Sequence, residues 1–551
     1  MIIAGLLGLV VIVGAVALLS SGPVEEQAQK SPQALEDEEE KAAQLADELL
    51  DNAWSMLQTD RFLLTSDLPP IAALLNEWLT LRGGIDAGTE LSTADRKTLE
   101  RLLPAEELSF VEQPRFTPRD ADHIGACLIE KAVAEQVTAG VEGDLEQVLA
   151  LFNYACRNIA LLDPESHIVS GRFQTLLLGR GAAEDRAHLF ANLLRQLQID
   201  SMILRPAASE SGDEPNEAHW LIGVLLNEEV YLFDPHLGWP VPSLEDDPNS
   251  VTAMLPATLA DAMNDDAVLR QLDLSQEHRH PLSSATLRDP RVLLIGSSSC
   301  WSPIMKKLQM SLTGDRAVVV YDGLLDDGQV AGLLTRVARF AGTQWNPEDT
   351  SLWAYPAQQA GAATDTESAD AKESARRMQR FEIPLERLVD LQQLTVQFGP
   401  PQHSLWKSRV TQLLGDYVSA TTVFQAIRID GDLPVQFKVN EDIRRMHAEG
   451  IDDATYWVGL CQYELGEFRS ARETLRNYLS VRVSVGGAWV DNARELFAIC
   501  LAREGRLAEA TLHMTELDDD LPRHRGPRLL LSRWRNMLET EETDAETEQG
   551  E

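Results

Sequence analysis

The side chains best suited to chemistry lie in the stretch 179–240. His219 begins an apolar run, polar residues follow at 227–229, and a second apolar run leads to Asp234. Two such runs joined by a short polar turn predict a β-hairpin, which brings His219 and Asp234 side by side. With a nearby carboxylate, this histidine could support hydrolysis by general acid–base catalysis.

A metal site is a second use for the same kind of side chains. His188, His219, His236 and Asp234 offer imidazole and carboxylate ligands. None of them has a diagnostic spacing such as H-E-x-x-H. His188 also lies among apolar residues of a predicted helix, where a buried histidine usually has a structural role. The sequence therefore predicts no metal ion and no other cofactor.

A helix that begins near Ala183 must position these groups. The Gly-rich turn 179–181 leads into a helix with an apolar stripe that continues to Arg195. Glu184 and Asp185 fall in its first turn, where negative charge suits the helix dipole and the free N–H groups. We expect these two carboxylates to stabilise the start of the helix.

The order of helix start, His and Asp resembles the transglutaminase-like, papain-related fold over roughly residues 115–240. In active members a Cys at the helix N-terminus is stabilised as a thiolate by the helix and by a His, which an Asp orients. The resemblance assigns these three positions to Ala183, His219 and Asp234. A methyl group cannot attack a carbonyl, and the stretch 171–199 contains no Cys or Ser. The resemblance thus implies vestigial catalytic positions and no expected catalytic residue.

Composition indicates a modular globular protein. The chain has 551 residues, of which 44% are hydrophobic, enough for several domains. Its 87 acidic and 48 basic residues give a formal net charge of -39, which disfavours nucleic acid as a partner. The five cysteines show no paired spacing, so neither a disulfide framework nor a zinc cluster is indicated.

The N-terminus predicts a membrane anchor. Residues 1–20 are apolar and uncharged, and about 20 such residues can span a bilayer as a helix. No basic residue precedes the apolar run, which favours a retained anchor over a cleaved signal peptide. A tether rich in Pro, Gln and Glu follows at 21–44. The protein is expected to span the membrane once, with its soluble part outside the cytoplasm.

The middle of the chain predicts a helical region at 45–114, a transglutaminase-like domain at 115–245 and a connecting region at 246–357. In the connecting region, apolar strands are expected at 291–295 and 317–321. The loop 296–300 between them, which ends at Cys300, matches neither G-x-S-x-G nor a P-loop. It therefore predicts an ordinary strand-to-helix turn.

The C-terminal third predicts helical repeats. A stretch at 358–377 with few large apolar residues predicts a flexible linker. Within 378–538, Gly415, Gly466 and Gly505 are each followed by an apolar residue and an Ala at fixed offsets, which resembles tetratricopeptide repeats. The acidic tail 539–551 is expected to be disordered.

These elements together predict a multidomain α+β protein: a transmembrane helix, a transglutaminase-like α+β domain, a small α/β segment and an all-α repeat domain. The expected function is a membrane-anchored, non-catalytic scaffold of the cell envelope that binds proteins through its repeats. An assembly factor of the envelope is a close variant of this function. The alternative is a cysteine-independent hydrolase or peptidase-like enzyme that uses His219 and nearby carboxylates.

Overall fold

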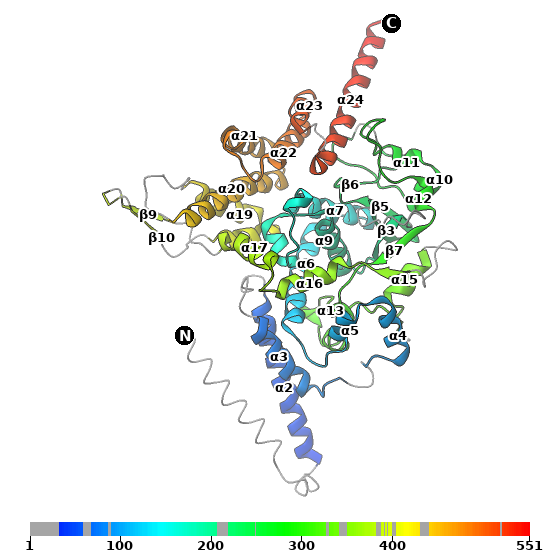
Figure 1. Cartoon of the computed structure of the whole chain (residues 1–551), viewed down its shortest axis with the longest axis vertical. Helices are drawn as coiled ribbons and strands as arrows, with labels where there is room; N and C mark the ends of the chain where they lie inside the picture. The colour runs from blue at the N-terminus through cyan, green and yellow to red at the C-terminus, as the bar shows by residue number, and fades with distance from the viewer. Residues whose placement is uncertain are drawn as a thin grey trace.

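The computed structural model describes most of the chain. The described residues are 32–58, 68–85, 90–206, 219–247, 250–326, 330–340, 350–381, 387–390, 392–393, 395–398, 404–429, 440–517 and 521–550. They form helices around one mixed sheet, with a helical array packed against one side (Figure 1).

The N-terminal region is helical, as predicted. It contains α2 (Pro32–Leu57), α3 (Leu68–Leu81), α4 (Thr93–Leu102) and α5 (Ala105–Val111). The apolar stripes of α2 and α3 pack together, and Leu50, Leu75 and Trp78 are almost completely buried.

The prediction of a membrane anchor needs correction. Its residues, 1–20, lie outside the described part of the chain, whereas part of the predicted tether is helical, because α2 begins at Pro32. Among the helices that the structure describes, none combines the length and the apolar character that crossing a bilayer requires. The described helices therefore do not support the transmembrane helix of the predicted architecture or the single-pass membrane location.

The central domain is built around the long helix α6 (Pro118–Thr138), α7 (Asp144–Asn158), α8 (Arg172–Leu178) and α9 (Ala183–Gln196). Thr117 and Asp120 form a capping box at the start of α6, as expected from Pro118 in the first turn. Phe152 of α7 and Phe190 of α9 stack edge to face. Both rings contact Phe233 of the sheet, so these helices and the sheet share one core.

The main sheet has six strands in the order β6-β5-β4-β3-β7-β8. They are β3 (Ser201–Pro206), β4 (Leu221–Leu226), β5 (Glu229–Asp234), β6 (Trp239–Pro240), β7 (Pro290–Leu294) and β8 (Ser351–Leu352). All neighbours are antiparallel except β7 and β8, which are parallel. A separate parallel pair joins β1 (Ala160–Leu161) to β2 (Arg180–Gly181).

The connecting region contains one of the two strands expected there. Strand β7 forms, but residues 317–321 are extended without joining a sheet. Two glutamine side chains bind this segment instead: Gln196 pairs with both the N–H and the C=O of Val319, and Gln309 accepts from the N–H of Val320. The short helices of the region are α10 (Leu259–Asn264), α11 (Ala267–Arg270), α12 (Ser284–Leu287), α13 (Ser298–Trp301), α14 (Pro303–Gln309) and α15 (Leu333–Phe340).

The stretch predicted as a flexible linker is folded. It forms α16 (Tyr355–Thr364) and α17 (Ala369–Met378), which pack on α6, α8 and α9. A Cβ on Gly171, the residue before α8, would lie 2.9 Å from the Cβ of Ala363. The small residues of this stretch therefore permit close packing rather than disorder.

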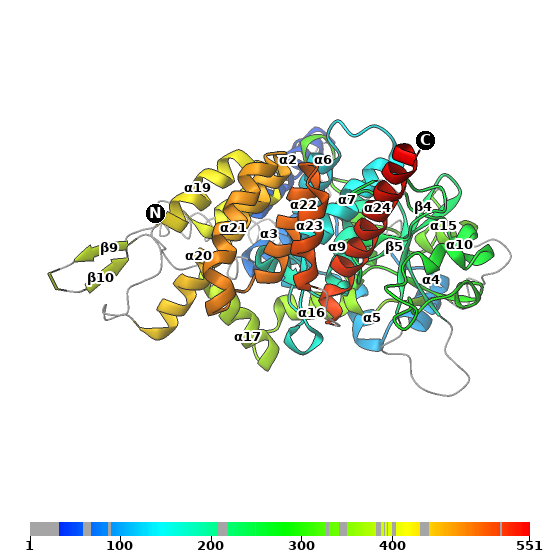
Figure 2. The same cartoon turned by 90° about the horizontal axis from the view of Figure 1, so that it is seen from above.

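The C-terminal region is consistent with helical repeats. It contains α18 (Leu405–Leu413), α19 (Tyr417–Ile429), α20 (Glu441–Glu464), α21 (Phe468–Val485), α22 (Val490–Arg503), α23 (Leu507–Met514) and α24 (Arg525–Gly550). Consecutive helices lie side by side (Figure 2). The predicted turn residues Gly415, Gly466 and Gly505 all have positive φ angles, between 74° and 83°. Helix α24 continues into the tail that was expected to be disordered.

A short hairpin of β9 (Arg387–Asp390) and β10 (Thr395–Phe398) precedes the array.

The array is joined to the central domain by polar contacts. Arg157 pairs with Glu464 at 2.6 Å, and Arg180 pairs with Asp453 at 3.1 Å. These ion pairs attach α7 and β2 to the long helix α20.

Candidate functional site

Helix α9 begins at Ala183, the position to which the resemblance assigns the nucleophile. Its first turn is capped by Asp185, whose Oδ2 accepts from the N–H of Ala182 at 2.8 Å. His167 contacts the same oxygen at 2.9 Å, and Tyr355 donates to Oδ1 at 2.6 Å. The expected structural role of Asp185 is confirmed, and its carboxylate is engaged away from His219.

The hairpin that carries His219 and Asp234 forms as predicted. Strands β4 and β5 pair up to Leu226 and Glu229, and the two turn residues between them, Asn227 and Glu228, have positive φ angles. His219 Nε2 donates to Asp234 Oδ2 at 2.7 Å.

Asp234 has a second imidazole partner. His280, from the loop between α11 and α12, places its Nε2 3.0 Å from the same Oδ2. The other oxygen, Oδ1, accepts from the backbone N–H groups of His236 and Leu237. Burial acts to raise the pKa of Asp234, but His219 and the hydrogen bond from His280 hold it well below its usual value. Asp234 is therefore a fully buried, ionised carboxylate.

His236 completes a group of three histidines. Its ring lies 4.4 Å from the His219 ring and 4.7 Å from that of Trp220. Burial, reinforced by the charge of His219, lowers the pKa of His236 to about 3. Its Nε2 is buried and has no hydrogen-bond partner among the described residues.

His188 does not belong to this group. It is buried in α9, where its Nδ1 contacts Gln359 at 2.7 Å and its ring packs against Trp353. Its role as a core histidine agrees with the sequence interpretation. The set of possible metal ligands considered from the sequence is thus only partly assembled: His219 and Asp234 meet, whereas His188 lies elsewhere.

Sequence reasoning missed His280. It lies 46 residues beyond Asp234, in a stretch of mixed helical and loop character. The only local signal is the pair of histidines at 278 and 280. Nothing in this local sequence indicates that His278 is exposed whereas His280 contacts Asp234.

Arg186 connects α9 to the turn after Asp234. It donates to the carbonyl oxygens of Ile159 at 2.8 Å and Pro235 at 3.2 Å.

Next to Arg186, Cys156 lines a pocket of about 140 Å³. Burial raises the pKa of Cys156 to about 11, so this thiol remains protonated near neutral pH and is a poor nucleophile.

Cys300 lies in the short helix α13, which follows β7 after the turn at 295–297, so the helix begins two residues before the end of the predicted loop 296–300. Its Sγ is 3.9 Å from Nε2 of His123, which is also 2.9 Å from the carbonyl of Val320. Burial, the largest effect, raises the pKa of Cys300, but His123 and Arg195 together lower it to about 5. The thiol is only 3% exposed and does not line the adjacent pocket, so a substrate has no access to it.

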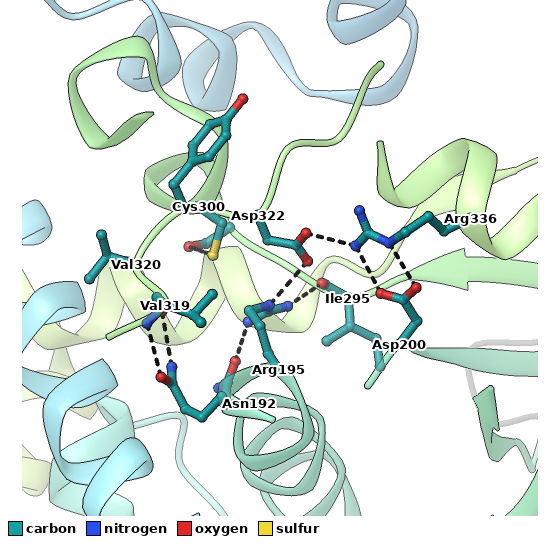
Figure 3. Close-up of polar contacts among 12 residues, drawn as sticks. Asn192, Arg195, Asp200, Ile295, Cys300, Val319, Val320, Asp322 and Arg336 are labelled. Carbon is teal, nitrogen blue, oxygen red and sulfur yellow. Dashed lines mark hydrogen bonds and ion pairs between the residues drawn. The ribbon is translucent and has the colours of Figure 1, made fainter. Parts of the chain in front are cut away.

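That adjacent pocket, of about 590 Å³, is lined by paired charges. Arg195 contacts Asp322 and the carbonyl of Ile295, and Arg336 bridges Asp322 and Asp200 (Figure 3). Each guanidinium faces a carboxylate at 3.4 Å or less. The four charges balance one another, which argues for a structural network.

Comparison with known proteins agrees with this geometry. No curated protein and no solved structure matches the chain. The model of the transglutaminase-like superfamily matches residues 131–239, from within α6 to β6. This match includes Ala183, His219 and Asp234 and lies inside the boundaries predicted from the sequence. The chain therefore contains a transglutaminase-like domain at residues 131–239.

Proposed function

We propose that the protein is a non-catalytic binding protein, in which the transglutaminase-like domain supports a helical array that binds partner proteins. The observation that carries this proposal is Ala183 at the first position of α9. The helix start that would activate a thiol offers a methyl group instead. The carboxylate that caps this helix start, Asp185, is occupied by Tyr355 and by the backbone N–H of Ala182.

The array offers a groove for a partner between α21, α22 and α23. This groove has a volume of about 580 Å³. Its apolar lining includes Leu479, Val483, Phe497 and Leu501. Val483 is 50% exposed. An exposed aliphatic side chain beside other apolar groups of a groove is typical of a protein-binding surface.

Arginines surround the apolar lining. They are Arg472, Arg476, Arg494 and Arg506. Arg472, Arg494 and Arg506 pair with Glu504, Glu516 and Glu509, whereas Arg476 is exposed and forms no ion pair with the described residues. The chain as a whole is strongly acidic, but at physiological salt charges beyond about 8 Å are largely screened. The charge of Arg476, which no ion pair among the described residues compensates, therefore favours a peptide that alternates aliphatic and acidic residues.

Binding can be tested on the full chain with fluorescent peptides of alternating Leu and Glu. We expect saturable binding that Arg476→Glu weakens at least tenfold, because the substitution places a like charge next to the peptide. Val418→Glu is the matched control, since Val418 is 64% exposed on α19, outside the groove. Absence of saturable binding, or equal loss in both variants, would refute the groove as the binding surface.

The hydrolase alternative requires a separate test. Full-length protein would be screened against peptide and ester substrates, with and without divalent metal ions, next to His219→Ala. We expect no turnover by either protein. Turnover that His219→Ala abolishes would overturn the non-catalytic proposal. A lower melting temperature alone would assign His219 to the stability of the hairpin.

A further inference from the structure

We propose that His219, Asp234 and His280 form a binding site for a divalent transition-metal ion of the zinc type. Each residue offers one ligand atom, and these three atoms all lie within 4.8 Å of one another. All three side chains are buried: the exposed fraction is 7% for His219, 0% for Asp234 and 2% for His280. This site is independent of the proposed peptide-binding groove.

The geometry of Asp234 directs one oxygen toward both histidines. Its Oδ1 is held by the N–H groups of His236 and Leu237, at 2.9 Å and 3.1 Å. Its Oδ2 therefore faces Nε2 of His219 at 2.7 Å and Nε2 of His280 at 3.0 Å. The two backbone donors orient the carboxylate, as contacts around metal ligands commonly do.

The ligand atoms must adjust their spacing to accept an ion: the two nitrogens move slightly away from Oδ2 and come to the same separation from each other, starting from no more than 4.8 Å. Tetrahedral zinc binds nitrogen and oxygen at about 2.0–2.2 Å, which separates neighbouring ligand atoms by roughly 3.3 Å. The two histidine nitrogens would each move a few tenths of an ångström away from Oδ2. The ion would replace two N–H···O hydrogen bonds, and each imidazole would bind through a deprotonated Nε2 while it carries its proton on Nδ1, with any further proton released to solvent.

The ligand types select the class of metal. Two imidazoles and one carboxylate suit Zn²⁺ and Co²⁺, whereas Ca²⁺ and Mg²⁺ prefer sites made only of oxygen. The negative charge of Asp234 compensates part of the charge of a dication in this buried position. The ring of His236 lies beside the site, and its buried Nε2 lacks a hydrogen-bond partner among the described residues.

The three ligands come from separate parts of the chain. His219 precedes β4, Asp234 ends β5, and His280 lies in the loop between α11 and α12. A bound ion would connect the hairpin to this loop. Because the ion binds the folded chain in preference to the unfolded one, it should raise the melting temperature.

The test uses the full chain freed of metal with a chelator and then titrated with Co²⁺ and, separately, Zn²⁺. We expect one equivalent of Co²⁺ to produce visible absorption bands of a tetrahedral site, and Zn²⁺ to displace it and raise the melting temperature. His280→Asn should weaken binding at least tenfold and abolish the thermal shift. His278→Asn is the matched control, because His278 is exposed two residues away, and it should bind as the wild type does.

Binding that His280→Asn leaves unchanged would overturn the site, as would the absence of binding at one equivalent or displacement of Co²⁺ by an equal amount of Ca²⁺. If His280→Asn does not fold in the metal-free state, His219→Asn replaces it, with circular dichroism as the check on folding. The same loss of metal binding is expected from that variant. Peptide binding to the array is expected to be identical with and without the metal.

Discussion

The guanidinium of Arg409, in the first helix of the array, donates from Nη2 to the carbonyl oxygen of Leu176 at 3.0 Å. It also contacts Asn158 Oδ1 at 3.2 Å, and its central carbon lies 4.7 Å from the ring of Trp457. Leu176 and Asn158 belong to the transglutaminase-like domain, whereas Trp457 belongs to α20. One fully buried side chain thus joins the two parts of the protein.

Replacing this side chain should destabilise the whole protein. Arg409→Met removes the donors to buried oxygens of Leu176 and Asn158, and we expect the free energy of unfolding to fall by about 3 kcal/mol. Urea unfolding followed by circular dichroism measures the change. Arg469→Met is the control, because that side chain is 82% exposed, and it should change stability by less than about 0.5 kcal/mol. Equal effects of the two substitutions would contradict this role of Arg409.

Asp185 should hold α16 against α9. Its Oδ1 accepts from Tyr355 and from Gln359, both in α16, so Asp185→Ala leaves two buried donors without an acceptor. We expect a loss of about 3 kcal/mol and faster hydrogen exchange at residues 355–364. Glu184→Ala, at the neighbouring position in the same helical turn, should leave exchange in α16 unchanged. Unaltered exchange in the Asp185 variant would show that α16 is held by other contacts.

Two glycine-to-alanine substitutions should change the stability of the protein in opposite directions. A Cβ on Gly459 would lie 2.8 Å from Cδ2 of Leu475, at the contact between α20 and α21. Gly459→Ala should therefore lower stability by about 1–3 kcal/mol. A Cβ on Gly361, within α16, meets nothing within 4 Å, so Gly361→Ala should raise stability by about 0.5–1 kcal/mol. Thermal unfolding of both variants measures the difference, and a shift in the same direction would refute the packing argument.

His188 should make the protein sensitive to acid. Burial, with the charge of Arg172, holds the pKa of His188 well below its usual value of 6.5. Below that pH the unfolded chain binds a proton at residue 188 that the folded chain does not, so stability falls by about 1.4 kcal/mol per pH unit from this residue. His188→Gln should therefore show a shallower decrease in stability between pH 6.5 and 4.5. Urea unfolding across this range tests it, and parallel curves would exclude the effect.

The hairpin and the helix starts could be predicted from sequence because local residues determine them. The turn at Asn227 and Glu228 separates two apolar runs, and Thr117 with Asp120 makes a capping box within one turn of helix. The turn glycines of the array are similarly local signals. The partnership of His280 with Asp234 is different, because only the tertiary fold brings that loop to the end of β5.

Two wrong predictions share a physical cause. An apolar run at 317–321 has the pattern of a strand, yet Gln196 and Gln309 supply the hydrogen bonds that a neighbouring strand would have made. The small residues of 358–377 have the composition of a linker, yet Gly171 and Ala363 use their small size to bring α8 and α16 together. In both cases residues distant in sequence determine the local structure.

The outermost strands of the six-stranded sheet, β6 and β8, are only two residues long. Pro240 in β6 also lacks a backbone N–H group. Long exposed edges allow sheets of different molecules to join and aggregate, and short edge strands are a common protection against it. The sheet that carries Asp234 is thus poorly suited to pairing with a strand of another molecule, which should reduce aggregation of the protein at high concentration.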